Sequence, residues 1–346
     1  MNRTSLFLIA LSALLPACAA LPLSPRPSPT PDAKALQGMI REAQGDSGAH
    51  DPTILKEGSI YYRFSTGHNI PISCSPDLVN WTHCGSVFLA KPGWLLKAVP
   101  GVADLWAPDV AFINGKYYLY YAASTFGSNL SAIGLVTSPT LDPKSPDYLW
   151  SDLGPVLQST FKDNFNAIDP NIVVEAPGKL WLAYGSYWSG IKLRRLDPET
   201  GLLPAGDSEV FAIASRLQPP YAVEGAFILP HKGEYFLFVS FDQCCNGVNS
   251  TYKIMVGRSK VISGPYLDRD GKPLTAGGGS LVLDGDAHWR GPGHNSVLTD
   301  GDKLYLVYHA YDATAAGTPK LRVEEIVWDG QGWPQSPSYL LRSSAK

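Results

Sequence analysis

A pattern that recurs five times constrains the fold of this chain more than any other feature of its sequence. Each copy has an apolar strand of about four residues, a turn that contains glycine, and a second strand rich in aromatic residues. Further strand-like segments follow each copy, which gives about four strands per unit. Five similar units predict an all-β chain that folds as a five-bladed β-propeller, with about four antiparallel strands per blade. The copies begin at intervals of about 55 to 70 residues, at Asp51, Pro108, Asp169, Glu224 and His294.

The repeat sets the domain boundaries. We expect residues 48–346 to form the propeller as one domain, preceded by a proline-rich spacer and N-terminal segment over residues 20–47. Within that segment, Ala33–Ala43 is the one candidate helix. Residues 1–19 have a basic start and a short apolar run, which is typical of a secretory signal peptide rather than a membrane span.

The end of the signal segment allows two interpretations. Ala17-Cys18-Ala19 fits a small-residue cleavage site, whereas Leu15–Cys18 resembles a bacterial lipobox in which Cys18 carries the lipid. Both predict export, and the protein is then secreted, periplasmic or an outer-membrane lipoprotein. Membrane attachment is expected only through a lipidated Cys18.

Charge and cysteine content narrow the class of protein further. The net charge of −3 gives no electrostatic footprint for nucleic acid. Export permits disulfides, and Cys74 and Cys84 flank a turn across which they can pair. Cys244 and Cys245 are neighbours in the sequence, so they form either a strained disulfide or a pair of buried thiols.

Ionisable residues gather at one position of the repeat. In a propeller the first strand of each blade lines the central channel, so equivalent residues of these strands meet at one mouth of it. The second unit has Ala107 at this position, with Asp109 two residues further on and on the same face of the strand. The aligned residues are Asp51, Ala107, Asp169, Glu224 and His294.

Three carboxylates and an imidazole at one channel mouth predict coupled titrations. Like charges raise the pKa of one carboxyl group, which is what a general acid needs near neutral pH. Two carboxyl groups across a cleft with a third to tune them are suited to cleavage of a glycosidic bond. A single Asp-Pro or a lone histidine is more often structural, so the prediction depends on the convergence of the four residues.

Motifs around these residues resemble glycoside hydrolase family 43, and within it the endo-α-1,5-L-arabinanases. Their order and spacing from Gly48 to about Pro334 are specific, although each motif alone is short. They are HDP at His50–Pro52, LWAPDV at Leu105–Val110, AIDPN at Ala167–Asn171, YGSYWSGI at Tyr184–Ile191, VEGAF at Val223–Phe227, CCNGVNSTYKIMVGRS at Cys244–Ser259 and GPGHNS at Gly291–Ser296.

The resemblance implies a role for each acid. Asp51 is expected to be the general base that activates water, and Glu224 the general acid that protonates the leaving oxygen. Asp169 is expected to raise the pKa of Glu224 and to help hold it in place. The implied course is a single displacement with inversion at internal bonds of arabinan. The resemblance also implies a calcium ion in the channel near His294, bound largely through water, with chloride or plain water as the alternative.

The resemblance further suggests residues that contact the sugar. Trp106 is expected to be a stacking platform and Phe126 a second one, although packing between blades is the commoner role of such aromatic residues. Arg322 is expected either to point into the channel and pair with an acid or to form a structural salt bridge. The complete set of expected substrate-binding residues is His50, Trp106, Phe126, Asn166, Ser186, Trp188 and Arg322.

Two other functions compete with an endo-arabinanase. One is an exo-acting α-L-arabinofuranosidase, exo-arabinanase or β-xylosidase of the same family, because the sequence does not reveal which loops close the groove. The other is a non-catalytic carbohydrate-binding propeller, against which the retention of Asp51, Asp169 and Glu224 argues. The expected partner is plant cell-wall arabinan or its oligosaccharides, bound by a monomer.

Overall fold

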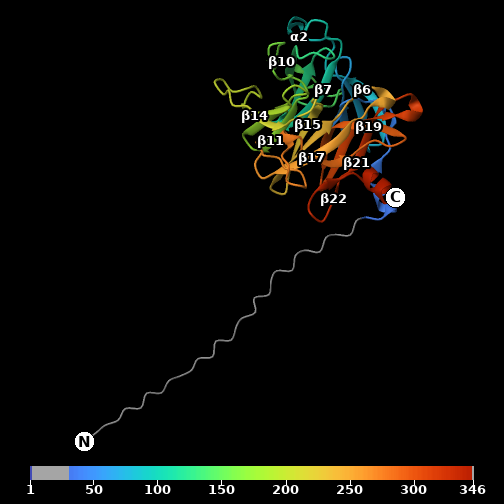
Figure 1. The fold of residues 1–346 in the computed structure, drawn as a ribbon. Helices are drawn as coiled ribbons and strands as arrows, with labels where there is room; N and C mark the ends of the chain where they lie inside the picture. The colour runs from blue at the N-terminus through green and yellow to red at the C-terminus, as the bar shows by residue number, and fades with distance from the viewer. Residues whose placement is uncertain (2–30, 345–346) are drawn as a thin grey trace.

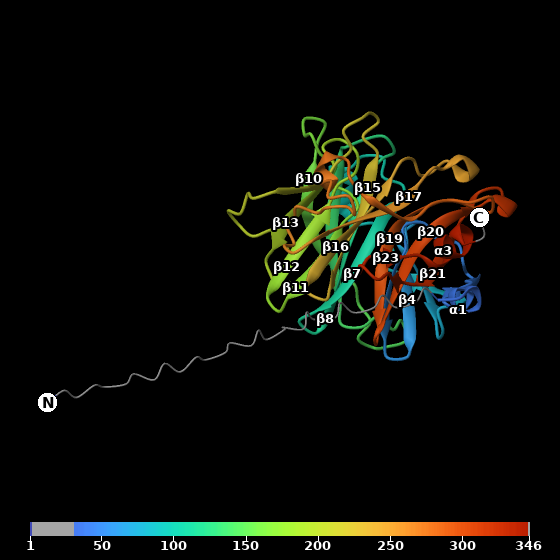
Figure 2. The ribbon, with the colours of Figure 1, turned by 60° about the horizontal axis from the view of Figure 1, so that its bottom comes forward.

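The computed structural model describes Met1 and residues 31–344, and in these residues it has the predicted architecture. Five antiparallel sheets follow one another along the chain, and their first strands contact each other in cyclic order (Figures 1 and 2). The prediction of a five-bladed propeller is therefore confirmed. The predicted signal peptide, Cys18 and the start of the spacer lie outside the described residues.

The blades are consecutive in the sequence, and most have four strands. The first blade has a fifth, because β2 (Gln44–Gly45) pairs in parallel with β6. The strands are β3 (Thr53–Glu57), β4 (Ile60–Phe64), β5 (Pro71–Ser75) and β6 (Asn80–Ser86) in blade 1; β7 (Leu105–Ile113), β8 (Lys116–Ala123), β9 (Ser131–Ser138) and β10 (Ser151–Ser159) in blade 2; β11 (Asn171–Ala176), β12 (Lys179–Tyr184), β13 (Ile191–Leu196) and β14 (Phe211–Ala214) in blade 3; β15 (Val223–His231), β16 (Glu234–Phe241), β17 (Lys253–Ser259) and β18 (Ser280–Leu283) in blade 4; and β19 (Trp289–Asp300), β20 (Lys303–Asp312) and β21 (Thr318–Glu325) in blade 5.

The fourth strand of blade 5 comes from the other end of the described chain. Strand β1 (Ile40–Arg41) pairs with β21, so that N-terminal and C-terminal segments close the ring together (Figure 2). Helix α1 (Ala33–Gly38) contacts α3 (Pro337–Ser343) beside this joint. The expected helix over Ala33–Ala43 thus ends at Gly38, and Ile40–Arg41 of that segment forms a strand of the last blade.

Short elements connect the blades. Helix α2 (Gly93–Ala98) lies between blades 1 and 2, and β22 (Val327–Trp328) pairs with β23 (Pro334–Gln335) after the last blade. Three 3₁₀ turns occur in loops, at Gly247–Asn249, Leu274–Ala276 and Ala313–Ala315. Among the described helices, none is long and apolar enough to cross a membrane.

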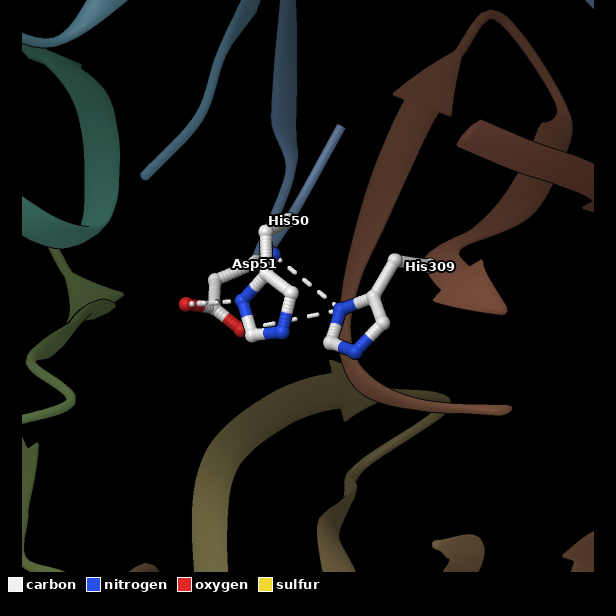
Figure 3. A group of neighbouring side chains, drawn as sticks. All are labelled: His50, Asp51 and His309. Atoms are coloured by element: carbon white, nitrogen blue, oxygen red, sulfur yellow. Dashed lines mark hydrogen bonds and ion pairs between the residues drawn. The ribbon is translucent and has the colours of Figure 1, made fainter. Parts of the chain in front are cut away.

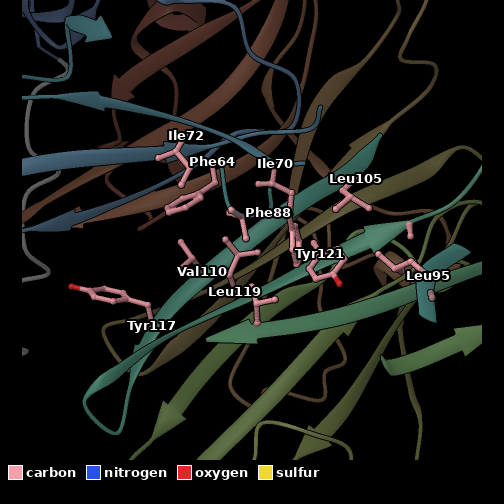
Figure 4. Packing of buried hydrophobic residues seen from close by; sticks show 14 of the residues in the cluster. Phe64, Ile70, Ile72, Phe88, Leu95, Leu105, Val110, Tyr117, Leu119 and Tyr121 are labelled. Carbon is pink, nitrogen blue, oxygen red and sulfur yellow. The ribbon is translucent and has the colours of Figure 1, made fainter. Parts of the chain in front are cut away.

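The core is divided into five apolar clusters, one between each pair of neighbouring blades. Figure 4 shows the cluster between blades 1 and 2, which includes Phe64 of β4 and Leu119 and Tyr121 of β8. These side chains are fully buried, and each contributes roughly 1.5–3 kcal/mol to folding by leaving water. The aromatic second strands of the repeat therefore hold the blades together, which leaves the inner strands free to carry polar groups.

Each inner strand enters the channel through a residue with left-handed backbone geometry. The ladder register shifts at these points in β7, β15 and β19, which marks a bulge. Left-handed geometry in a residue other than glycine costs about 1–3 kcal/mol, so the fold must enforce it. The residues, with φ values, are Asp51 (47°), Ala107 (45°), Asp169 (57°), Gly225 (59°) and His294 (48°).

This geometry corrects the alignment of the fourth unit. Gly225, and not Glu224, is the equivalent of Asp51 and Asp169. Glu224 lies one residue earlier, at the position that Trp106 occupies in blade 2, because both are the last paired residues before the bulge. The acid therefore enters the site from a different backbone position than the other two carboxylates.

Hydrogen bonds join the inner strands of blades 1 to 4 in order and tie the inner strand of blade 5 to the start of blade 1. Asp109 accepts a hydrogen bond from Thr53 of blade 1 at 3.2 Å and from the Asn171 side chain of blade 3 at 2.8 Å. Asn171 Oδ1 accepts from the backbone of Ile228 in blade 4, and Ser296 of blade 5 donates to Pro52 O in blade 1. Asp109 thus joins blades 1, 2 and 3.

Both cysteine pairs are disulfide-bonded. Cys74 of β5 and Cys84 of β6 pair across one blade, as the sequence allowed. Of the two interpretations of Cys244 and Cys245, the structure has the disulfide between neighbouring residues. The first disulfide lies on outer strands, and the second lies in the wall of the pocket described below.

Candidate active site

A pocket with a volume of about 880 Å³ opens at the mouth of the central channel. The three predicted acids and His294 all line it, although they come from four different blades. Asp51 and Glu224 are each 8% exposed and Asp169 is 6% exposed, so burial affects all three to a similar degree. The structure therefore brings together the residues that the repeat aligned.

Asp51 is surrounded by imidazoles. His50 Nδ1 lies 2.9 Å from Asp51 Oδ2, and His294 Nδ1 lies 3.1 Å from Oδ1. Thr66 donates a hydrogen bond to Oδ2 at 2.6 Å, and the backbone N–H of Asp51 donates to His309 Nδ1 at 3.1 Å (Figure 3). Burial alone would raise the pKa of Asp51, but the nearby His294 and His50 hold it well below its ordinary value. Asp51 is therefore an ionised carboxylate.

Glu224 accepts hydrogen bonds from neutral hydroxyl groups instead. Ser186 donates to Oε2 at 2.5 Å, and the buried Tyr252 donates to Oε1. Burial raises the pKa of Glu224, and these two hydrogen bonds offset only part of the rise. A carboxyl group whose pKa is raised can hold a proton for transfer near neutral pH.

Asp169 and His294 complete the charged cluster. Asp169 Oδ2 accepts a hydrogen bond from the backbone of Gly225 at 3.0 Å, which ties this carboxylate to the residue after Glu224. Burial raises the pKa of Asp169 to about 7; His294 opposes this rise, and the charge of Glu224 adds to it. For His294, burial would lower the pKa, but Asp51 and Asp169 raise it to about 10.

The predicted sugar platforms lie around these acids. Trp106 at the bulge of blade 2, Phe126 after β8 and Trp188 after β12 all line the pocket. Phe126 is 83% exposed and Trp188 is 39% exposed. Exposure of large aromatic side chains at a pocket rim costs hydrophobic stabilisation, and stacking against a sugar ring recovers it.

Three other predicted contacts have a role within the protein. His50 pairs with Asp51, and Ser186 donates to Glu224, so both side chains orient an acid from the pocket wall. Asn166 uses both ends of its amide, because Oδ1 accepts from Ser131 and Nδ2 donates to Ser128 O.

The prediction that Arg322 binds substrate is wrong. Its guanidinium pairs with Glu42 at 2.6 Å, just beyond strand β1, and lies over the ring of Trp289. It does not line the pocket. Arg322 forms the structural salt bridge that was the alternative, and it ties the N-terminal segment to the last blade where the ring closes.

Sequence reasoning did not assign four polar residues at the site. Thr66 and His309 contact Asp51, Tyr252 contacts Glu224, and the Tyr311 hydroxyl lies 2.9 Å from His50 Nε2. Tyr252 lies inside the longest family motif, and His309 and Tyr311 share one face of β20. The signal was therefore present, but a tyrosine in a strand is usually a core residue.

A calcium ion bound directly by side chains would need a cluster of oxygen ligands. Among the described residues, His50, Asp51 and His309 form the one group of three close ligand atoms. The two imidazole rings stack with centroids 4.0 Å apart, and His309 Nδ1 already accepts a hydrogen bond from the backbone of Asp51 (Figure 3). Calcium prefers six to eight oxygen ligands. These residues do not fit a calcium cage, and an ion held near His294 by water stays a prediction.

Comparison with known proteins identifies the family of this chain. The model for glycosyl hydrolases family 43 matches residues 46–334. The chain is 44% identical over 290 residues to "Extracellular endo-alpha-(1->5)-L-arabinanase 1" of Bacillus subtilis, covering 82% of this chain and 86% of that protein. It is 42% identical over 297 residues to "Extracellular exo-alpha-(1->5)-L-arabinofuranosidase ArbA" of Cellvibrio japonicus, covering 83% and 85%.

A solved structure gives the same fold. The Cellvibrio cellulosa α-L-arabinanase complexed with arabinohexaose superposes with a TM-score of 0.81 at 42% identity, covering 86% of this chain and 97% of that chain. The family model spans most of the chain and includes all three acids of the pocket. This chain belongs to glycoside hydrolase family 43.

Proposed function

We propose that the protein is an endo-α-1,5-L-arabinanase that hydrolyses internal α-1,5-L-arabinofuranosidic bonds of arabinan with inversion. The observation that carries the proposal is the separation of two equally buried carboxyl groups into an ionised Asp51 and a Glu224 with a raised pKa. Two titratable groups with opposite environments are the arrangement that acid–base cleavage of a glycosidic bond requires. The similar proteins named as arabinanases support arabinan as the substrate.

The reaction follows from these environments. Asp51 accepts a proton from a water molecule, whose oxygen attacks the anomeric carbon. Glu224 gives its proton to the glycosidic oxygen as that bond breaks. The histidines that keep Asp51 ionised also make it a weak base, so its contribution depends on accurate orientation of the water. Asp169 holds the segment after Glu224 and adds negative charge that favours the protonated acid.

The test is a time course on linear α-1,5-arabinan with product sizes resolved by chromatography. Mixed oligosaccharides at early times are the expected result, and NMR of the first products is expected to show the inverted anomer. Asp51→Ala and Glu224→Ala, each checked for folding by circular dichroism, are expected to be inactive. Wild-type activity in either folded variant contradicts the assignment.

Exo action is the second candidate, because one relative of almost equal identity is named as an exo-acting arabinofuranosidase. The same time course separates the two. Monomer or one short product from the first time point identifies an exo enzyme whose groove is blocked at one end.

We also propose that the protein is exported and works as a monomer on cell-wall arabinan or its oligosaccharides. The extracellular names of its relatives support export. Attachment to a membrane is proposed only through lipid on Cys18. Cell fractionation of the wild type and of Cys18→Ser tests this, because loss of membrane association in the variant alone identifies the lipid anchor.

A further inference from the structure

Tyr252 is a buried residue at the junction of a loop and a strand, and the proposed mechanism gives it no role. It lies where the loop that follows β16 enters β17, and only 2% of it is exposed. A Cβ atom on Gly293 would lie 2.1 Å from the Tyr252 ring. The absence of a side chain at Gly293 therefore leaves the space that fixes this ring against blade 5.

The hydroxyl of Tyr252 reaches one oxygen of the general acid. It donates to Glu224 Oε1, and in the described part of the chain it has no other hydrogen-bond partner. If its oxygen instead accepted a hydrogen bond from a protonated Glu224 Oε1, the buried hydrogen of Tyr252 would be left without an acceptor, which is costly. Burial and the nearby carboxylates raise its pKa well above its ordinary value, so Tyr252 keeps its proton and acts as a permanent donor.

The other oxygen of Glu224 has a partner that can adapt. Ser186 Oγ lies 2.5 Å from Oε2, and a serine hydroxyl rotates to donate or to accept. Because Tyr252 occupies Oε1 as a donor, the acid proton of Glu224 is directed to Oε2. The two oxygens of the acid therefore differ, although a free carboxyl group has no such preference.

We propose that Tyr252 is a positioning residue that fixes Glu224 Oε1 as an acceptor and so directs the acid proton to Oε2, from which it passes to the leaving oxygen. This inference rests on the proposed function. In the step, the Oε2–H bond breaks and an O–H bond forms on the glycosidic oxygen as its bond to the anomeric carbon breaks. Water supplies the new C–O bond, and its proton passes to Asp51. Glu224 is left as a carboxylate that accepts from Tyr252 and Ser186.

Tyr311 provides a matched control because it serves the base and not the acid. It is 3% exposed, against 2% for Tyr252. Its hydroxyl lies 2.9 Å from His50 Nε2 and accepts a hydrogen bond from the backbone of Cys245 at 2.8 Å. Replacement of either tyrosine by phenylalanine removes one buried hydroxyl group, but the two changes affect opposite sides of the reaction.

The experiment compares Tyr252→Phe and Tyr311→Phe on two substrates. One is arabinohexaose, whose leaving sugar oxygen needs a proton. The other is a 2,4-dinitrophenyl α-1,5-arabinotrioside, whose leaving group departs without one. We expect Tyr252→Phe to lower kcat about 10- to 100-fold on the hexaose and less than about 3-fold on the dinitrophenyl substrate. Tyr311→Phe is expected to lower kcat by the same factor on both.

Equal losses on both substrates in Tyr252→Phe, or no loss on either, would overturn the inference. A wild-type enzyme that cleaves neither substrate contradicts the proposed function instead, so the two failures are distinguishable. Thermal melting of both variants shows whether they fold.

A double variant gives an independent measurement. In Glu224→Gln the acid is already lost, so adding Tyr252→Phe is expected to cause no further loss on the hexaose, the substrate on which each single change lowers kcat. A loss in the double variant that multiplies the two single losses would show that Tyr252 acts independently of Glu224.

Discussion

Asp51 and Glu224 lie in the same pocket and are each 8% exposed, but their neighbours differ. Imidazoles of His50 and His294 surround Asp51, whereas the hydroxyl groups of Ser186 and Tyr252 bind Glu224. Burial raises the pKa of both carboxyl groups, so burial cannot separate them. The partners separate the two pKa values, because the cationic His294 lowers that of Asp51, whereas the neutral hydroxyl groups on Glu224 offset only part of the effect of burial.

The different partners of Asp51 and Glu224 follow from their different positions in the backbone. Asp51 has left-handed backbone geometry just before β3, whereas Glu224 lies one residue before Gly225, which has the same geometry. The one-residue offset moves the acid from the row of Asp51 and His294 to the row of Trp106. A small shift in an otherwise repeated strand therefore gives two carboxyl groups different partners.

The largest expected effect comes from neutralising each of the two acids in turn, which tests their different roles. Asp51→Asn and Glu224→Gln are each expected to lower kcat on linear arabinan about 10³- to 10⁴-fold. On a dinitrophenyl arabinoside, Glu224→Gln is expected to regain most of its activity, since the leaving group needs no acid, and Asp51→Asn is not. Recovery in Asp51→Asn would mean that the roles of the two residues are reversed.

Asp169 tests whether nearby charge sets the pKa of the acid. In the wild type, kcat/KM is expected to fall as pH rises through the titration of the Glu224–Asp169 pair, because the acid must be protonated; the pKa of Asp169 is about 7. On the acid side, activity is expected to persist until Asp51 is protonated, well below its ordinary pKa.

In Asp169→Asn one negative charge is removed, so the pKa of Glu224 falls and the alkaline limb moves to lower pH. The pH dependence of kcat/KM for this variant measures the shift. Glu199→Gln, which neutralises an exposed carboxylate in a turn outside the pocket, is the control and is expected to leave the limb in place. An unchanged limb in Asp169→Asn would remove Asp169 from the control of Glu224.

Asp109 is a buried carboxylate that we expect to stabilise the contacts between blades and to take no part in the reaction. It is buried and has a pKa raised by burial to about 6, yet it lies outside the pocket. Asp109→Ala removes its hydrogen bonds to Thr53, Asn171 and the backbone of Ile172, and is expected to lower the free energy of unfolding by about 2–4 kcal/mol.

Urea unfolding measures this effect, with Asp104→Ala as the control. Asp104 is exposed before β7, and its change is expected to stay within about 0.5 kcal/mol. The kcat of the folded Asp109→Ala fraction is expected to match that of the wild type. A loss of kcat without a loss of stability would give Asp109 a catalytic role.

The fold and the positions of the acids could be predicted from the sequence because both follow from the repeat. Five similar units predict five blades, and the channel position then brings Asp51, Asp169 and His294 together whatever the loops do. The one-residue offset of Glu224 could not be predicted, because it depends on where the bulge interrupts the strand ladder. A strand pattern with a period of two does not show which residue will be left-handed.

The residues that orient the acids were harder to find than the acids. Tyr252 and His309 look like the core residues that fill most propeller strands, and only their three-dimensional neighbours reveal the difference. Arg322 shows the opposite error. Its place in the last blade suggested the channel, but ring closure by β1 brings Glu42 to it. Contacts between the two ends of the described chain cannot be predicted from motifs within either end.

The two disulfides offer the smallest and most local contrast. Cys244–Cys245 lies in the pocket wall, and its backbone N–H donates to Tyr311, which contacts His50 on the base side. Cys74–Cys84 joins two outer strands of blade 1. The double variant Cys244→Ser/Cys245→Ser is expected to lower kcat about 3- to 10-fold, because one disordered hydrogen bond in a positioning chain costs about 0.5–1.5 kcal/mol.

The matched double variant Cys74→Ser/Cys84→Ser is expected to keep kcat. The Cys74–Cys84 disulfide closes a loop of sequence separation 10, so its loss is expected to lower the free energy of unfolding by about 2–3 kcal/mol. Kinetics on linear arabinan and urea unfolding of both variants measure the two effects. An unchanged kcat in Cys244→Ser/Cys245→Ser would show that the vicinal disulfide does not support the base through Tyr311. An equal loss of kcat in Cys74→Ser/Cys84→Ser would show that the effect is not specific to the pocket wall.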